Sequence, residues 1–583
     1  IDSMTGSGAT VLGGTLTIGD ASNTSGTYEG VLSGAGGLTK AGTGSLTLTG
    51  ANTYTGVTSI TAGTLRASNA AALGDTAAGT TVASGATLEI AGGIAIGAEA
   101  LTLSGTGVGA NGALIVASGS GSYGGAITLG ASTSLGGDGR LTLGGTLEGD
   151  AGGTSALTQA GSGTLTFGGT VGATDALAAV TTSDGQATAI NGGSVRTTGA
   201  QNYGGRVTTT GTLTLTSTNG GAINANNAGN DFKGNLVLST AGSASILDSN
   251  ALALGASSVA TLTAQAAAGD LVLNGAITAS GGGDAIVLAA SANFVNNIGA
   301  GALSAPNGRW LVYSTSPAGS IENGLTAAAG SSLPRLYDRT FSANGPTTIG
   351  EAGNHLIYGS KPALSVSADN KSRAYGDANP AFTYTTGGFV VDDGVADTAG
   401  TAGLTGEPNL TTSATGTSNP GLYAINAAPG TLLSSAGYGL SFIDGSLTVG
   451  ARPIPVMPND PPQPQPAPQP QAQPAPEPQA QPGPVRAFVF LLPDLGGPPV
   501  STFAAAALDD PGRFSFNDLP PTGAGGDDVA EACGATAEDC ARTDPVGRSF
   551  IVIGSGIRLP QGVTAKTPGP ARLARFGAPT ARR

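Results

Sequence analysis

Short runs of alternating apolar and polar residues recur from Gly14 to about Ala290. Leu46-Thr47-Leu48-Thr49 is typical, and similar runs follow at Leu101-Thr102-Leu103 and Leu213-Thr214-Leu215. A period of two residues points successive side chains to opposite faces of a strand, so the aliphatic residues face a core and the threonines face solvent. Glycines close these runs and permit sharp bends. The pattern predicts many short strands that stack around a narrow core.

An internal repeat supports this stacking. Residues 38–50 (LTKAGTGSLTLTG) match residues 157–169 (LTQAGSGTLTFGG) at a distance of 119 positions. Degenerate copies of this kind are typical of solenoids, whose rungs are similar but not identical. We therefore predict an all-β fold dominated by a right-handed parallel β-helix, with roughly 20 residues per rung. A β-sandwich is the alternative for short strands with frequent turns, and the lack of clear hairpin pairs favours the β-helix.

The amino-acid composition of the chain changes several times after residue 300. Tyr, Pro and Asp become more frequent, then a stretch rich in Pro and Gln follows that should run as extended polyproline II. A small β domain lies between these two changes and opens with the alternating run Ala363–Ala368. The predicted parts are a β-helix rod (1–300), its end and connector (301–360), the small β domain (361–450), an extended linker (451–484) and a C-terminal segment with a basic tail (485–583).

Composition excludes several classes of protein and of site. Glycine accounts for 99 of 583 residues, which disfavours long helices. The net charge of −14 argues against a nucleic-acid surface. A single histidine, His355, and two cysteines rule out multi-histidine and four-cysteine metal sites, and His355 is expected to be structural. We predict no catalytic residue, no cofactor and no metal, and no apolar run long enough for a membrane-spanning helix.

Specific runs resemble two families of exported bacterial proteins. Residues 37–56, ending Asn52-Thr53-Tyr54-Thr55-Gly56, resemble the β-strand repeat of autotransporter passengers. Residues 308–314 and 355–359, followed by Arg373–Pro380 (RAYGDANP), are similar to the stalk and the MBG module of large adhesins of the filamentous haemagglutinin type. The resemblance covers roughly residues 14–450. It implies a secreted or surface-displayed adhesin, associated with the outer membrane of a Gram-negative bacterium, that binds a glycan or protein on host or bacterial cells.

The route of export is inferred from the C-terminal segment. A self-translocating autotransporter ends in its own barrel of alternating strands, and only 99 residues follow the linker here. We therefore expect a separate outer-membrane barrel of the two-partner secretion class as the export partner. The chain begins at Ile1 without a signal peptide, so we interpret it as a mature protein or a fragment of a larger exoprotein.

Seven residues are candidates for functional roles. We expect Cys533 and Cys540 to form a disulfide, which by resemblance to some two-partner adhesins tethers the protein at the exporter; a local staple is the alternative. Trp310 and Tyr313 are candidates to stack on a sugar ring, or else they cap the end of the solenoid. Tyr375, Asp377 and Asn379 form either a ligand loop or a fixed turn ending at Pro380.

The function predicted from the sequence is adhesion, through an extended surface of hydroxyls and amides that gains strength from multivalency. A self-associating structural or biofilm matrix protein is the first alternative. An enzyme that degrades polysaccharides is the second, but acidic residues are sparse between residues 14 and 290 and basic partners are fewer, so we predict no enzyme. A contact-dependent toxin is a third, but the C-terminal segment shows no nuclease or hydrolase constellation.

Overall fold

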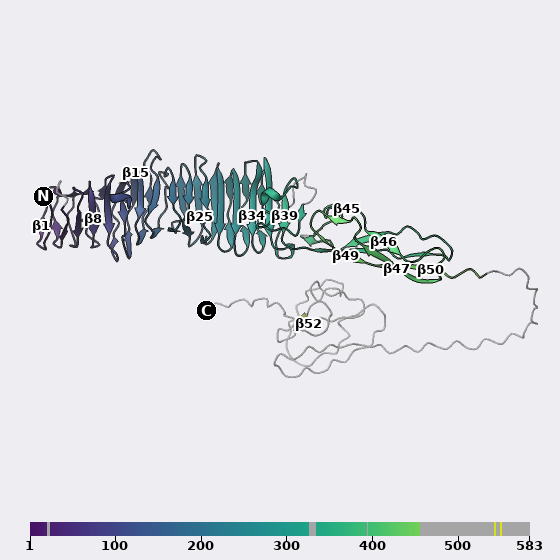
Figure 1. The fold of residues 1–583 in the computed structure, drawn as a ribbon. Coiled ribbons are helices and arrows are strands. Elements are labelled where there is room, and N and C mark those ends of the chain that lie inside the picture. The colour runs from purple at the N-terminus through teal and green to yellow at the C-terminus, as the bar shows by residue number, and fades with distance from the viewer. Residues whose placement is uncertain (20–23, 326–333, 393, 455–541, 544–548, 551–583) are drawn as a thin grey trace, which may run out of the picture. The chain divides into compact units, whose positions relative to one another are not determined.

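The computed structural model describes residues 1–19, 24–325, 334–392, 394–454, 542–543 and 549–550 (Figure 1). Contacts divide the chain into two units, Ile1–Pro458 and Asn459–Arg583. In the second unit the described residues form one antiparallel pair, β51 (Arg542–Thr543) with β52 (Ser549–Phe550). The predicted linker and C-terminal segment therefore lie mostly outside the described residues.

The first unit begins with a parallel β-solenoid of about 15 turns, which confirms the predicted parallel β-helix. Every strand pairing in its described part is parallel, so it is not a β-sandwich. The described residues outside strands include three 3-10 turns, η1 (Val108–Ala110), η2 (Pro317–Gly319) and η3 (Pro346–Thr348). Turn length varies, because paired residues are 18 positions apart at Leu236 and Leu254 and 26 apart at Leu101 and Ile127.

Strands of successive turns stack in three columns, here called A, B and C. Column A contains β2 (Leu16–Ile18), β5 (Leu38–Lys40), β7 (Thr58–Ile60), β9 (Thr80–Val82), β12 (Leu101–Gly105), the start of β15 (Ile127–Gly136), β17 (Leu147–Glu148), β22 (Ser194–Thr197), β25 (Leu213–Ser217), β27 (Asn235–Thr240), β29 (Leu252–Leu254), β32 (Leu271–Leu273) and β35 (Phe294–Asn296). A short additional stack of strands begins beside the end of β27. It consists of β30 (Ser257–Val259), β33 (Ile277–Ala279) and β36 (Leu303–Ser304).

Column B runs the whole length of the solenoid. It contains β3 (Gly26–Tyr28), β6 (Ser45–Leu48), β8 (Gly63–Ala67), β10 (Ala86–Ile90), β13 (Leu114–Ile115), the end of β15, β18 (Leu157–Ala160), β20 (Val180–Thr182), β23 (Gln201–Tyr203), β26 (Ile223–Ala225), β28 (Ser243–Asp248), β31 (Thr261–Ala266), β34 (Gly283–Ala290), β37 (Gly308–Ser314), β38 (Arg335–Leu336) and β39 (His355–Tyr358). Column C contains β1 (Thr10–Val11), β4 (Leu32–Ser33), β11 (Ala95–Ile96), β14 (Ser120–Tyr123), β16 (Arg140–Leu143), β19 (Thr164–Phe167), β21 (Ala187–Ile190) and β24 (Arg206–Thr208).

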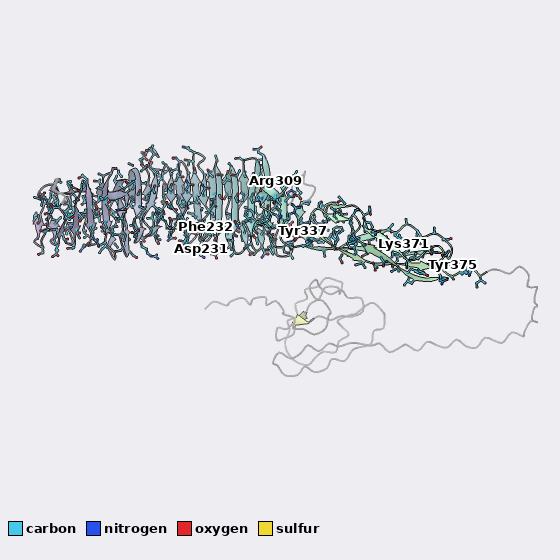
Figure 2. All side chains as sticks on the ribbon, in the orientation of Figure 1. Asp231, Phe232, Arg309, Tyr337, Lys371 and Tyr375 are labelled. Carbon is cyan, nitrogen blue, oxygen red and sulfur yellow. The ribbon has the colours of Figure 1, made fainter. Side chains whose placement is uncertain are left out.

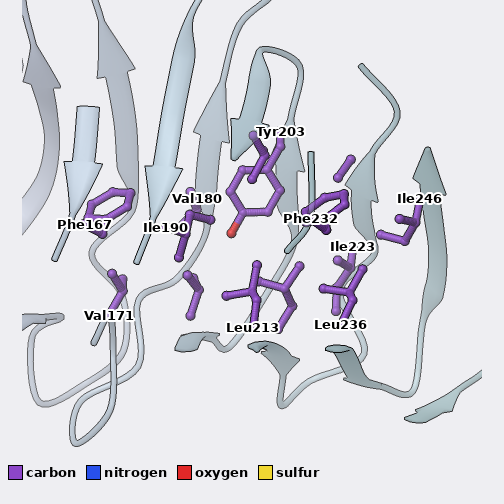
Figure 3. Packing of buried hydrophobic residues seen from close by; sticks show 14 of the residues in the cluster. Phe167, Val171, Val180, Ile190, Tyr203, Leu213, Ile223, Phe232, Leu236 and Ile246 are labelled. Carbon is purple, nitrogen blue, oxygen red and sulfur yellow. The ribbon is translucent and has the colours of Figure 1, made fainter. Parts of the chain in front are cut away.

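The hydrophobic core consists of inward-facing side chains stacked along the length of the solenoid. In most strands alternate residues are buried, as the period-two pattern predicts, whereas β34, β37 and β39 are buried at nearly every position. One continuous cluster runs from Met4 to Tyr438. Figure 3 shows a section in which the aromatic rings of Phe167, Tyr203 and Phe232 fill the width between aliphatic residues such as Leu213 and Leu236. The interior is therefore narrow and filled by side chains from every turn.

The two copies of the sequence repeat do not occupy the same columns. The first copy supplies β5 and β6 in columns A and B, whereas the second supplies β18 and β19 in columns B and C. The local bend is nevertheless alike. The Lys40 ammonium donates to the carbonyls of Ala41 (2.7 Å), Gly42 (2.8 Å) and Ala62 (3.1 Å), and the Gln159 amide donates to the carbonyls of Gly163 (3.1 Å) and Ala187 (3.0 Å). In each copy a buried polar side chain thus bonds its own bend and the next turn.

A small mixed β module follows the solenoid. It has a three-stranded sheet in the order β42 (Tyr384–Gly387), β40 (Ala363–Ala368), β49 (Gly439–Ile443), and a four-stranded sheet in the order β41 (Lys371–Arg373), β50 (Gly445–Val449), β47 (Gly421–Ala428), β46 (Asn409–Thr412). Two further pairs join β43 (Val391–Asp392) to β44 (Val395–Ala396) and β45 (Leu404–Thr405) to β48 (Leu433–Ser434). The opening run predicted at Ala363–Ala368 is strand β40.

Candidate functional site

Trp310 and Tyr313 are core residues of β37. Each is 2% exposed, and the Tyr313 hydroxyl donates to the Asn344 carbonyl at 3.0 Å while its ring packs edge-on against Phe341. Neither ring offers a face on which a sugar could stack. Trp310 does not close the solenoid either, because β39 pairs with β37 and covers it.

Charged side chains surround a shallow depression beside this turn. It has a volume of about 520 Å³ and is lined by Arg339, Asn344, Thr348, Ile349, Gly350 and Glu351. Arg339 makes a two-pronged ion pair with Glu351, with N–O distances of 2.9 and 2.6 Å. The hydrogen bonds from Arg339 lower the pKa of Glu351. Because its charges are already paired, the depression has little left to offer a charged ligand.

His355 lies in β39 and is fully buried. Its Nε2 lies 3.1 Å from the Glu351 carbonyl. A structural role was expected for His355, and the residue lies within a strand pairing. Among the residues that the structure describes, no group of three or more His, Cys, Asp or Glu side chains could hold a metal ion.

The turn with the three predicted ligand residues lies in the module and is built around Arg373. This buried guanidinium donates to Asn379 Oδ1 at 2.7 Å and to the Ala374 and Thr415 carbonyls, and the Asn379 amide donates to the Ala414 carbonyl at 2.7 Å. Asn379 therefore holds the turn together and has no free hydrogen-bonding role.

The other two residues of this turn differ in exposure. Asp377 is exposed. Tyr375, labelled in Figure 2, is half-buried, and the guanidinium carbon of Arg452 lies 5.4 Å from the centroid of its ring. The three residues thus lie in one turn, and Asp377 is the most accessible of them to a partner.

A buried ion network joins the end of the solenoid to the module. Arg335 of β38 donates to both Glu322 oxygens at 3.1 and 2.7 Å, and to Asp397 of the module at 3.2 Å. The side chains of Arg335, Glu322 and Asp397 are at most 7% exposed. Sequence analysis missed this network, because the three residues are distant in sequence and isolated charges are usually solvated.

Three tyrosines complete the network. Tyr337 and Tyr438 donate to the same oxygen of Asp397 at 2.7 and 2.5 Å, and Tyr358 donates to Glu322. The ring of Tyr337 stacks on Tyr358 and meets Tyr438 edge-on, with centroids 5.8 and 4.7 Å apart. These hydroxyls disperse the excess negative charge of two carboxylates that share one guanidinium.

The surroundings of the network keep its donor groups protonated. Burial, followed by the hydrogen bond to Asp397, raises the pKa of Tyr438 to about 12. Burial alone lowers the pKa of Arg335, but its hydrogen bonds and ion pairs with Glu322 and Asp397 more than offset this and raise it. These two donors therefore stay protonated at neutral pH, and the network joins the module to the solenoid.

The remaining predicted site falls outside the described residues. Cys533 and Cys540 lie in that part, so their disulfide stays a prediction. No helix among the described residues is both long and apolar enough to cross a membrane.

Two family models match parts of the chain. A model described as an MBG domain (YGX type) matches residues 364–448, which are the module and include Tyr375-Gly376-Asp377. A model described as a passenger-associated-transport-repeat matches residues 38–67, which are β5 to β8 of the solenoid. No curated protein and no solved structure matches the chain. With the parallel solenoid, the two matches fit a secreted β-helical passenger of the autotransporter or adhesin kind.

Proposed function

We propose that this chain is an adhesin, a secreted or surface-displayed part of a large exoprotein from a Gram-negative bacterium, which attaches to cells, glycans or other bacteria. The observation that carries the proposal is the joining of a passenger-type solenoid to an MBG domain through the buried Arg335 network. A stalk that ends in a firmly attached module suits the presentation of a binding surface away from the cell.

A binding role rather than a catalytic one is part of the proposal. The long sides of the solenoid present Thr, Ser and Asn side chains, which can form many weak contacts along a partner. The export partner in this proposal is a separate outer-membrane barrel of the two-partner class. Secretion of the chain by a Gram-negative host should then depend on co-expression of such a barrel.

Retention on surfaces tests adhesion. The purified full chain should be retained on intact epithelial or bacterial cells, or on immobilised glycans, above the level of the heat-denatured chain. Asp377→Ala in the exposed module turn should reduce retention if that turn contacts the receptor. Asp75→Ala, which removes an exposed aspartate from a solenoid turn, is the matched control. No retention of the native chain on any surface contradicts the adhesin proposal.

A self-associating matrix protein is the second candidate. Five of the thirteen large hydrophobic residues exposed in the described part of the chain lie in the module: Val391, Val395, Leu422, Leu433 and Ile443. The module also leaves the outer edges of β41, β42, β46 and β49 unpaired within its two sheets. Exposed apolar residues and open edges both favour association between chains. Sedimentation of the pure chain without ligand separates the candidates, because a matrix protein forms large assemblies and an adhesin need not.

A further inference from the structure

A second shallow depression lies on the outer side of the solenoid, far along the chain from the module turn. It has a volume of about 410 Å³ and lies over three successive turns of column B, at β20, β23 and β26. Its polar lining is Asp184, Asn202, Asn224, Asn226 and Asn227. The Tyr203 ring below it belongs to the core, as Figure 3 shows.

Gly204 lines this depression and lies close against the backbone of the preceding turn. A Cβ atom at this position would lie 2.8 Å from the Thr182 carbonyl oxygen, so no larger residue fits without displacing the backbone. The carbonyl of Gly204 instead accepts a hydrogen bond from the Asn227 amide at 2.9 Å.

The amides of the depression are held by hydrogen bonds to one another and to the next turn. The Asn224 amide donates to Asn202 Oδ1 at 2.8 Å, and the Ser245 hydroxyl donates to Asn226 Oδ1 at 2.9 Å. These bonds use one polar atom each of Asn202, Asn224 and Asn226, whereas Asn227 uses both, because its amide donates to Gly204 and its oxygen accepts from the Gly229 N–H. Asn202 Nδ2, Asn224 Oδ1 and Asn226 Nδ2 have no partner among the described residues, so donors and acceptors lie side by side.

The charge of the lining selects the ligand. No basic side chain lines the depression, which disfavours phosphate, sulfate and acidic sugars. A single carboxylate, Asp184, is too few for a calcium site. The apolar part of the lining comes from Gly204, Ala228 and the 3% exposed Tyr203, so no aromatic ring face is open to a ligand. Neutral hydroxyl groups remain, because each can both donate to a carboxamide oxygen and accept from a carboxamide nitrogen.

The polar surface continues beyond the depression. Thr181, Asn202, Asn224 and Ser245 are directly paired from one turn to the next, so their side chains form a ladder with one step of about 4.8 Å per turn. An extended chain of sugar rings lying along the solenoid would meet a hydroxyl or amide at every turn. We propose that this amide depression is a binding site for a neutral glycan chain, which rests on the adhesive function proposed above and names its ligand class.

Binding of neutral oligosaccharides to the full chain tests the inference. Cello-, xylo-, malto- and galacto-oligosaccharides are titrated by calorimetry or saturation-transfer NMR. At least one should bind, and its affinity should change little when salt is raised to about 0.5 M, because no ion pair is involved. Asn226→Ala, and separately Asn202→Ala with Asn224→Ala, should weaken that affinity by about tenfold through lost hydrogen bonds.

Asn274→Ala is the matched control. Asn274 bonds to Asn235 and Asn297 at 2.8 Å in a second exposed amide ladder, and it does not line this depression. It should leave affinity unchanged, and thermal unfolding should show that every variant is folded. The inference is overturned if no neutral glycan binds, if acidic glycans bind better, or if the Asn226 and Asn274 variants lose affinity equally. Retention on cells with none of these glycans binding would refute the glycan site while leaving the adhesin proposal standing.

Discussion

Glu99 is a carboxyl group inside the solenoid. It is 2% exposed, it accepts a hydrogen bond from the Thr80 hydroxyl, and burial raises its pKa to about 7. Burial, and to a smaller extent the charge of Glu99, raise the pKa of both Tyr54 and Tyr123. The Tyr123 hydroxyl has no hydrogen-bond partner in the described structure. This stretch of the core therefore holds a polar group at a cost in stability when that group is ionised.

We predict that Glu99→Gln changes the pH dependence of stability. The pKa of this carboxyl rises from about 4.5 in the unfolded chain to about 7 in the folded one, so the folded state binds the extra proton between these values. The contribution of Glu99 to stability is therefore fully present below about pH 4.5 and is lost as pH rises through 7, by about 3 kcal/mol in all. Glutamine lacks the charge, so the variant should be more stable than the native chain at about pH 8.

Urea unfolding at about pH 5 and about pH 8 measures this difference. Glu29→Gln, at an exposed position, is the control and should leave the pH dependence unchanged. Equal pH dependence in the native chain and the Glu99 variant would refute the assignment of the buried charge.

At the scale of the element, the bends between strands control the solenoid. Gly63 begins β8 with a φ of +63°, and it follows the bend that Lys40 ties to the next turn. A Cβ atom here would lie 2.3 Å from the Gly44 carbonyl oxygen, 2.5 Å from that of Gly42 and 2.8 Å from Lys40 Nζ. Glycine is thus needed both for its backbone conformation and for the close approach of two turns.

Gly63→Ala should destabilise the solenoid by about 3 kcal/mol or more, because strain in the left-handed region adds to overpacking. Gly13→Ala is the matched control, since nothing lies within 4 Å of its Cβ position. Denaturant unfolding followed by circular dichroism compares the two. Similar losses in both variants would mean that these contacts do not limit the bend.

At this scale the sequence predicts strands better than their placement. The alternating run at Ser45–Leu48 forms a strand with alternate burial, because a two-residue period is a local property. The column of a strand depends on how many residues each preceding turn uses, and paired residues are between 18 positions apart, at Leu236 and Leu254, and 44 apart, at Leu311 and His355. The bends at Lys40 and Gln159 are alike because they depend on nearby residues of the repeat. The columns of the two copies differ because they depend on the lengths of the preceding turns.

At the scale of the whole folded unit, the Arg335 network decides whether the solenoid and the module unfold together. Its charges come from Glu322 and Arg335 at the solenoid end and from Asp397 of the module. Removing one partner of a buried ion cluster leaves the others uncompensated, which costs about 3–5 kcal/mol. The module has only a small core of its own, built around Ala368, Ala414, Ile425 and Leu447.

Arg335→Met should therefore uncouple the module. We expect calorimetry to resolve an earlier transition for the module, and limited proteolysis to cleave it first. Lys361→Met is the control, because its ion pair with Asp338 is about half exposed on both sides and contributes little. A single unchanged transition in the Arg335 variant would show that the network does not fasten the two parts.

The sequence by itself determined the features that depend on neighbours along the chain. These are the alternating strands, the glycine bends, the all-β parallel solenoid and the module with its Tyr375-Gly376-Asp377 turn. Local backbone sterics, a two-residue period and an internal repeat indicate the strands and the solenoid, whereas the module was identified from its resemblance to MBG modules.

Only the tertiary structure decided which side chains meet across long separations. It buried Trp310 and Tyr313, tied Asn379 to Arg373, and brought Glu322, Arg335 and Asp397 into one cluster. It also placed Asn202 and Asn224 on adjacent turns. Such contacts depend on the lengths of all the turns between the residues and on which side chains become buried. No local sequence pattern encodes either of these.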